Sequence, residues 1–164
     1  MARAGIGDRV EGFHAVAAAV QAGRARSVRI EERRLKGSAY TSLAEAARSA
    51  GAEVEYVSDV RAHALTSAPQ GVVAACEPKQ TVSIEEAVAT TQPSALLVFD
   101  HLDDQRNLGA AIRSAVAAGL ESIVVPKRRA APIGAAAFKA AGLFLSFSRI
   151  DRSVITHSVD FIPL

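Results

Sequence analysis

Apolar residues in the first half of the chain recur at spacings that predict an α/β unit over residues 9–77. Stretches 10–22 and 41–50 carry apolar side chains three and four positions apart, which is typical of helices with one buried face. Runs at 27–30, 53–57 and 71–75 are typical of strands, and a short helix is predicted over 61–65. The expected inner faces of the two longer helices consist of Phe13, Val16, Ala17, Val20, Leu43, Ala46 and Ala47, with His14 as a packed core histidine.

The second half predicts a regular order of strand, helix, strand and helix. Residues 95–99 form a continuous apolar run, as expected of a strand buried in a parallel sheet. A helix is predicted over 107–118, a strand over 122–125 and a further helix over 134–141. This alternation implies right-handed crossovers and a parallel sheet. Such sheets bind ligands beyond the carboxyl ends of their strands, where the loops 100–107 and 126–133 lie.

These patterns predict the fold class α/β and an organisation in four parts. We expect an N-terminal domain at 9–77, a linker at 78–93 that includes a short helix at 84–90, a partial parallel-sheet domain at 94–141 and a divergent tail at 142–164.

Composition narrows the class of protein without naming a function. The 164 residues are 49% hydrophobic and 22% charged, which is ordinary for a globular protein, and the net charge of +2 does not by itself indicate a nucleic-acid partner. Cys76 is the single cysteine, so cysteines alone provide neither a disulfide framework nor a zinc site, and the histidines show no metal-ligand spacing. The sequence has no membrane-length apolar run and opens without the pattern of a signal peptide, so we expect a cytoplasmic protein that binds no metal and no membrane.

Polar residues follow the apolar strand at 95–99 in a distinctive order. Asp100 ends the strand, Asn107 and Gly109 form an Asn-x-Gly sequence, and Arg113 follows four residues after the glycine. A Pro-Lys pair ending at Lys127 comes after the next strand. This order resembles the first signature motif of the SpoU (TrmH-like) RNA ribose 2′-O-methyltransferases.

The N-terminal part resembles the same family. The sequences Val10-Glu11-Gly12 and His14-Ala15-Val16 are similar to the opening of its small RNA-recognition domain, and residues 70–74 to its closing strand. The family often has a histidine where this chain has Pro69. The resemblance covers about residues 9–140, and it implies a small α/β RNA-recognition domain followed by a knotted, parallel-sheet methyltransferase domain that is incomplete here.

The resemblance implies S-adenosylmethionine-dependent 2′-O-methylation of ribose by a homodimer, in rRNA or tRNA, with rRNA favoured. Arg113 is the expected catalytic residue, because its planar fork can grip a phosphate beside the target ribose. Asn107 is expected to act with it through its amide, and Gly109 to allow close backbone approach. The residues expected to bind RNA are Gln70, Lys127, Arg128, Arg129, Arg24 and Arg26, the last two within a basic group that continues to Lys36.

Each of these residues also has a plain structural interpretation. Asn107 is a residue type that caps helices, and Arg113 taken alone is typical of a solvated helix position. Residues 127–129 form an ordinary exposed loop in that interpretation, and the basic group at 24–36 an ordinary solvated surface diluted by Glu31 and Glu32.

After residue 140 the resemblance ends. The family continues with glycine-rich and asparagine-rich motifs that build the cofactor pocket and the dimer surface, whereas residues 142–164 contain neither. We therefore expect a cofactor pocket that is incomplete, impaired activity and a tail that is truncated or out of frame, which translation of the other two reading frames would test. A short paralogue is the alternative origin.

Two other functions stay open. One is a non-catalytic RNA-binding module, a remnant of such an enzyme. The other is a doubly wound nucleotide-binding protein of a different kind, which is disfavoured because no glycine-rich phosphate loop follows the strand at 95–99.

Overall fold

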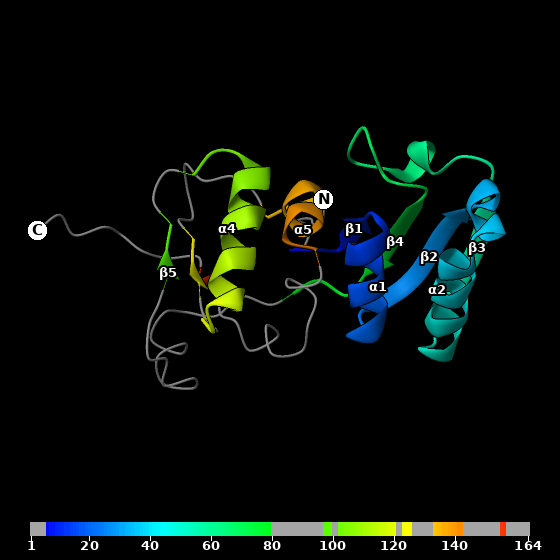
Figure 1. Cartoon of the computed structure of the whole chain (residues 1–164), viewed down its shortest axis with the longest axis horizontal. Coiled ribbons are helices and arrows are strands. Elements are labelled where there is room, and N and C mark those ends of the chain that lie inside the picture. The colour runs from blue at the N-terminus through cyan, green and yellow to red at the C-terminus, as the bar shows by residue number, and fades with distance from the viewer. Residues whose placement is uncertain are drawn as a thin grey trace, which may run out of the picture.

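The computed structural model describes residues 6–79, 97–99, 102–120, 123–125, 133–142 and 155–156. Two sheets lie at opposite ends of the molecule, and helices α4 and α5 lie between them (Figure 1). The mixture of sheets and helices confirms the predicted α/β class. None of the helices in these ranges has the length and apolar character needed to cross a bilayer.

The larger sheet has four strands in the order β1-β4-β2-β3. Strand β4 runs antiparallel to both β1 and β2, whereas β2 and β3 are parallel. The elements of this unit are β1 (Arg9–Glu11), α1 (Phe13–Gln21), β2 (Ala25–Glu31), the 3-10 helix η1 (Glu32–Lys36), α2 (Ser38–Ser49), β3 (Glu53–Val57), the 3-10 helix η2 (Val60–His63) and β4 (Val72–Cys76).

The core of this unit lies between the sheet and its two helices. Val10, Ala74 and Val28 stand side by side across β1, β4 and β2, and each is almost fully buried. Helices α1 and α2 cover this face, and Val16 and Ala44 are completely buried there (Figure 1). Removing this apolar surface from water stabilises the unit, because burial contributes about 25 cal/mol for each Å².

Three sequence predictions for this unit need correction. Residues 10 and 11 belong to β1 and not to a helix, because they pair with β4 and Gly12 breaks the backbone with a φ of 88°. On α2 the buried residue beside Leu43 is Ala44, while Ala46 is exposed. His14 is exposed, so the prediction of a core histidine is wrong.

The smaller sheet has three parallel strands in the order β5-β6-β7. Its elements are β5 (Leu97–Val98), α4 (Gln105–Ala117), β6 (Ile123–Val124), α5 (Ala135–Ala141) and β7 (Ile155–Thr156). Leu108, Ile112 and Ala115 are buried on α4 as predicted, and Ala111 is half-buried. Strand β7 lies in the tail, where the sequence showed no period; most of the predicted linker and its helix at 84–90 lie outside the described residues.

Helix α5 joins the two halves by packing against β1 and α1. Phe138 is completely buried, and the guanidinium of Arg24 lies 5.6 Å from the centroid of its ring. Nη2 of Arg24 also donates hydrogen bonds to the carbonyls of Gly7 at 2.9 Å and Glu77 at 2.7 Å. These contacts hold the segment between α1 and β2 against α5.

Candidate functional site

A cleft of about 250 Å³ lies where the two halves meet. One wall comes from the β1–α1 junction and the β3–β4 loop, and the other from α4 and α5. The polar and charged side chains that line it are His14, Gln70, Arg113, Lys139 and Glu11. The cleft therefore combines His14, Gln70 and Glu11 of the first half with the two cations, Arg113 and Lys139, of the second half.

Arg113 lies on helix α4, whose N-terminus is capped by a side chain. The carboxylate of Asp104 accepts hydrogen bonds from the backbone N–H groups of Asn107 at 3.1 Å and Arg106 at 2.7 Å. These bonds favour the ionised carboxylate and lower the pKa of Asp104. Asp104, and not Asn107, is therefore the cap of the helix. Asn107 is exposed in the first turn and is not among the residues that line the cleft, so the structure does not bring it together with Arg113 there.

Gly109 allows α4 and α5 to cross closely. A Cβ atom on Gly109 would lie 2.8 Å from the Cβ of Ala140 and 3.0 Å from the backbone nitrogen of Ala141. No side chain fits at that separation, so the glycine in the Asn-x-Gly sequence has a packing role. The close approach sets where α5 carries Lys139.

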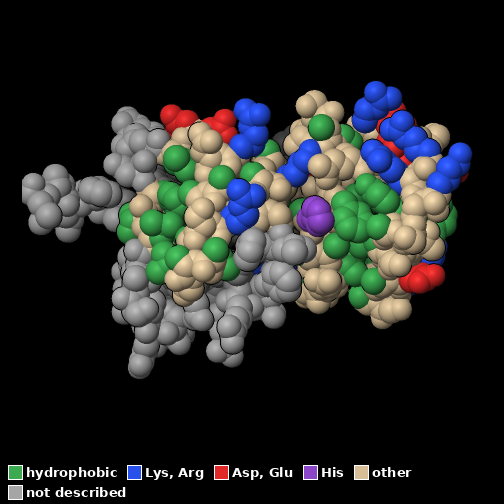
Figure 2. Space-filling view, viewed as in Figure 1, with side chains coloured by type: hydrophobic (Ala, Val, Ile, Leu, Met, Phe, Trp, Pro, Cys, Tyr) green, Lys and Arg blue, Asp and Glu red, His purple; other side chains and the backbone are tan. Residues whose placement is uncertain are grey.

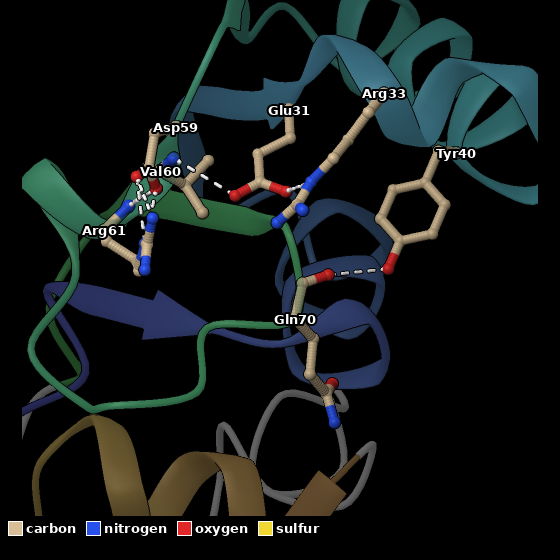
Figure 3. Close-up of polar contacts among 7 residues, drawn as sticks. All are labelled: Glu31, Arg33, Tyr40, Asp59, Val60, Arg61 and Gln70. Atoms are coloured by element: carbon tan, nitrogen blue, oxygen red, sulfur yellow. Dashed lines mark hydrogen bonds and ion pairs between the residues drawn. The ribbon is translucent and has the colours of Figure 1, made fainter.

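Gln70 supports the opposite wall through two hydrogen bonds. Its side-chain Oε1 accepts from the backbone N–H of Phe13 at 3.2 Å. Its backbone carbonyl accepts from the hydroxyl of Tyr40 at 2.7 Å (Figure 3). Gly12 is the N-cap residue of α1 and has no side chain that could accept a hydrogen bond from the first backbone N–H groups of the helix. The side chain of Gln70 accepts one of these bonds instead. Gln70 adopts a φ of 59°, a left-handed conformation that is uncommon for a residue other than glycine.

Two buried carboxylates hold the loop that carries Gln70. Glu11, which is 1% exposed, accepts from the hydroxyl of Thr66 at 2.5 Å and from the backbone N–H groups of Thr66 and Leu65. Glu31, which is 2% exposed, accepts from Nε of Arg33 at 2.5 Å and from the backbone N–H of Val60 at 3.5 Å (Figure 3). The Arg33 guanidinium lowers the pKa of Glu31. Both carboxylates thereby fix the loop against the sheet.

Lys139, for which the sequence predicted no role, and His14, which it predicted as a core residue, both line the cleft. The Lys139 ammonium donates a hydrogen bond to the carbonyl of Ala68, so α5 contacts the β3–β4 loop directly. His14 follows Phe13, and the two rings meet edge to face with centroids 5.5 Å apart. Their shared location depends on the packing of α5 on α1, which no local motif indicates.

The predicted RNA-binding residues differ in burial and in the partners they contact. Arg24 is 7% exposed and engaged with backbone carbonyls and Phe138, so the prediction that it contacts RNA is corrected to a structural role. Arg26 is exposed and forms an ion pair with Glu77 at 2.5 Å. Asp100, Pro126, Lys127, Arg128 and Arg129 lie outside the described residues.

The cleft fits an anion and does not fit S-adenosylmethionine. Arg113 and Lys139 would repel the positively charged sulfonium, and the cavity is smaller than the roughly 300–1,000 Å³ usual for ligands of that size. A phosphate suits the same side chains, because guanidinium and ammonium groups donate to its oxygens. Within the described ranges no group of histidine, cysteine and carboxylate side chains is arranged to hold a metal ion.

Comparisons with known proteins find similarity to RNA methyltransferases. Residues 9–82 match the family model for RNA 2′-O ribose methyltransferase substrate binding. The 23S rRNA (guanosine-2′-O-)-methyltransferase RlmB of Coxiella burnetii is 31% identical over 132 residues, which are 74% of this chain and 51% of that protein. The chain thus spans about half the length of the relatives it matches.

Solved structures show the same fold. The SpoU methyltransferase AviRb from Streptomyces viridochromogenes aligns over 92% of this chain and 53% of its own, with a TM-score of 0.66 and 21% identity. An AdoMet-bound rRNA methyltransferase from Sinorhizobium meliloti aligns over 91% of this chain and 53% of its own, with a TM-score of 0.61 and 20% identity.

Proposed function

We propose that this chain acts in the 2′-O-methylation of ribosomal RNA, because residues 9–82 match the family model for RNA 2′-O ribose methyltransferase substrate binding and the chain is similar to 23S rRNA (guanosine-2′-O-)-methyltransferases. S-adenosylmethionine is the proposed methyl donor, and the proposed acting form is a cytoplasmic homodimer. The residues described here hold the RNA.

One observation carries this proposal: Arg113 lies in the same cleft as Gly12, His14 and Gln70 of the substrate-binding domain. A ribose hydroxyl must be held in line with the methyl group for displacement to occur, and positioning of this kind supplies a large part of such rates. Arg113 is exposed and makes no ion pair within the described part of the chain, so its guanidinium is available to a phosphate. Because a guanidinium stays protonated, Arg113 orients the substrate and does not remove the proton.

Other residues have supporting parts in the proposal. Asn107, which is exposed on α4 about 1.7 turns before Arg113, contacts the nucleotide through its amide. Lys127, Arg128 and Arg129 contribute contacts to phosphates that do not depend on sequence. Gln70 shapes the wall against which the RNA lies, because it caps α1.

A methyl-transfer assay tests the function. The chain is mixed with labelled S-adenosylmethionine and an unmodified 23S rRNA transcript, and labelled RNA is counted. Arg113→Ala is expected to reduce transfer about 100-fold, since misplaced substrates lose rate on that scale. Arg106→Ala is the matched control: it removes an exposed arginine of the same helix whose guanidinium pairs with Asp104 at 3.5 Å. Equal activity of the two variants would contradict the proposed role of Arg113.

A non-catalytic RNA-binding module is the second candidate. It is favoured by the match of residues 9–82 to the family model for RNA 2′-O ribose methyltransferase substrate binding. RNA binding without any methyl transfer, measured with the same transcript, would support this function over the first.

A further inference from the structure

A chain of ring and cation contacts runs from η1 to the cleft. The guanidinium of Arg34 lies 5.7 Å from the centroid of the Tyr40 ring. The rings of Tyr40 and Phe13 have centroids 5.0 Å apart, and those of Phe13 and His14 5.5 Å apart. His14 then lines the cleft that contains Arg113. We call Arg34, Tyr40, Phe13 and His14 the aromatic track.

The track is accessible and rigidly mounted. Arg34 and His14 are exposed, and Tyr40 and Phe13 are half-buried. Gln70 holds the two central residues, since it accepts a hydrogen bond from the backbone N–H of Phe13. It accepts another from the Tyr40 hydroxyl (Figure 3). On the face drawn in Figure 2, a histidine lies beside a group of hydrophobic side chains, with Lys and Arg side chains on both sides.

Some cations of the domain are paired with carboxylates and others are not. Arg26, Arg29, Arg33 and Arg61 each form an ion pair with a carboxylate. Among the residues that the structure describes, Arg34 and Arg113 are exposed and have no such ion pair, which is also true of Arg9, Lys36 and Arg48; what sets Arg34 apart is its position over the Tyr40 ring, and what sets Arg113 apart is its position in the cleft. Cations without carboxylate partners keep their full attraction for phosphate groups.

Resting on the proposed function, we propose that the aromatic track binds a single-stranded segment of RNA and leads it to Arg113 in the cleft. Unpaired bases stack on aromatic side chains, whereas the bases of a duplex are already stacked on one another. His14 offers an exposed ring at the entrance to the cleft, and Arg34 offers a cation at the other end of the track. Interleaved rings and cations of this kind are typical of surfaces that bind single strands.

Fluorescence anisotropy with the full chain and a labelled oligonucleotide on the order of 12 nucleotides tests this, with the same sequence as a duplex for comparison. The single strand is expected to bind several-fold more tightly than the duplex. His14→Ala is expected to weaken binding of the single strand about 5- to 100-fold, the usual loss of one stacked base, whereas His14→Phe keeps a ring and restores the affinity. Because His14 is exposed, both variants are expected to fold, which circular dichroism checks.

Salt dependence supplies the second readout. Arg34→Ala is expected to lower the slope of log affinity against log salt by about 0.7, the value of one phosphate contact on a single strand. Arg61→Ala is the matched control, because its exposed guanidinium already pairs with Asp59 at 2.7 Å. The track is overturned if the duplex binds as tightly as the single strand, or if His14→Ala and Arg34→Ala both bind like the unaltered chain.

The binding assay contains no methyl donor. A negative result for the aromatic track can therefore be distinguished from a negative result for the proposed methyl transfer. Binding that depends on the track without methyl transfer would overturn the function and support the track. Methyl transfer that depends on Arg113 with binding indifferent to the track would overturn the track alone.

Discussion

The guanidinium of Arg24 lies over the ring of Phe138, with 5.6 Å between its central carbon and the ring centroid. The two residues belong to different halves of the chain, and both are buried. Their contact holds α5 against β1, and α5 forms the cleft wall that carries Lys139. The sequence predicted Arg24 as a surface residue that binds RNA, whereas in the structure it belongs to the buried contact between the two halves of the chain.

Replacing Arg24 by methionine is expected to lower the free energy of unfolding by about 1–3 kcal/mol, because the carbonyls of Gly7 and Glu77 lose their buried donor. Urea denaturation measures the change. Arg26→Met is the control, since its ion pair with Glu77 is exposed and such pairs contribute little. Equal losses in the two variants would contradict the structural role of Arg24.

Gly109→Ala is expected to destabilise the packing of α4 on α5 by about 1–3 kcal/mol, the usual cost of overfilling a packed contact. The added carbon would meet Ala140 at 2.8 Å. Thermal melting followed by circular dichroism measures it. Ser114→Ala, on the exposed side of the same helix, should change stability by less than about 0.5 kcal/mol. A variant at Gly109 that melts like the unaltered chain would show that the helices do not cross closely.

Asp104→Ala is expected to lower the melting temperature more than Asp103→Ala, because only Asp104 caps α4. Since its pKa is lowered in the folded chain, the cap stabilises fully above the ordinary aspartate pKa of 3.8 and is lost as the pH falls through the lowered value. Melting at pH 7 and again near pH 2 should therefore show the difference between the two variants shrinking in acid.

Cys76 should resist alkylation in the native chain. The thiol is 4% exposed, and burial raises its pKa to about 11, so little reactive thiolate exists at pH 8. Mass spectrometry after iodoacetamide treatment at pH 8 is expected to show labelling in urea and almost none without it. Rapid labelling of the native chain would mean that β4 is open to solvent.

Acid should loosen the β3–β4 loop before the helices unfold. Hydrogen bonds from Arg61 lower the pKa of Asp59 to about 2, and Arg33 lowers that of Glu31. Both contributions to stability are present above the ordinary carboxylate values and are lost as the pH falls through the lowered ones. Amide hydrogen exchange of residues 58–70 is expected to accelerate as the pH approaches 2, after correction for intrinsic exchange. Arg61→Ala should move the onset to higher pH.

Local spacing in the sequence was enough to predict most helices and strands of the chain, because their apolar faces recur at fixed intervals. The motif around Arg113 also placed that residue on a helix that follows a strand, as the structure has it, but the prediction that this strand is buried is wrong for β5, where Leu97 is half-buried and Val98 is 48% exposed. Pairing between distant segments was not predictable in this way, since residues 10 and 11 fit a helical pattern and yet pair with β4. The choice between helix and strand there depends on a partner strand far along the chain.

The sequence by itself determined the α/β class, the family resemblance and the candidate role of Arg113, because all three depend on the spacing of residues that are close together in the chain. Only the tertiary structure decided that Arg24 is buried, that His14 is exposed and that Lys139 lies across from Gln70. The physical reason is that burial and proximity depend on how α5 packs against α1 and β1. Residues of that contact are far apart in the sequence, and no local period relates them.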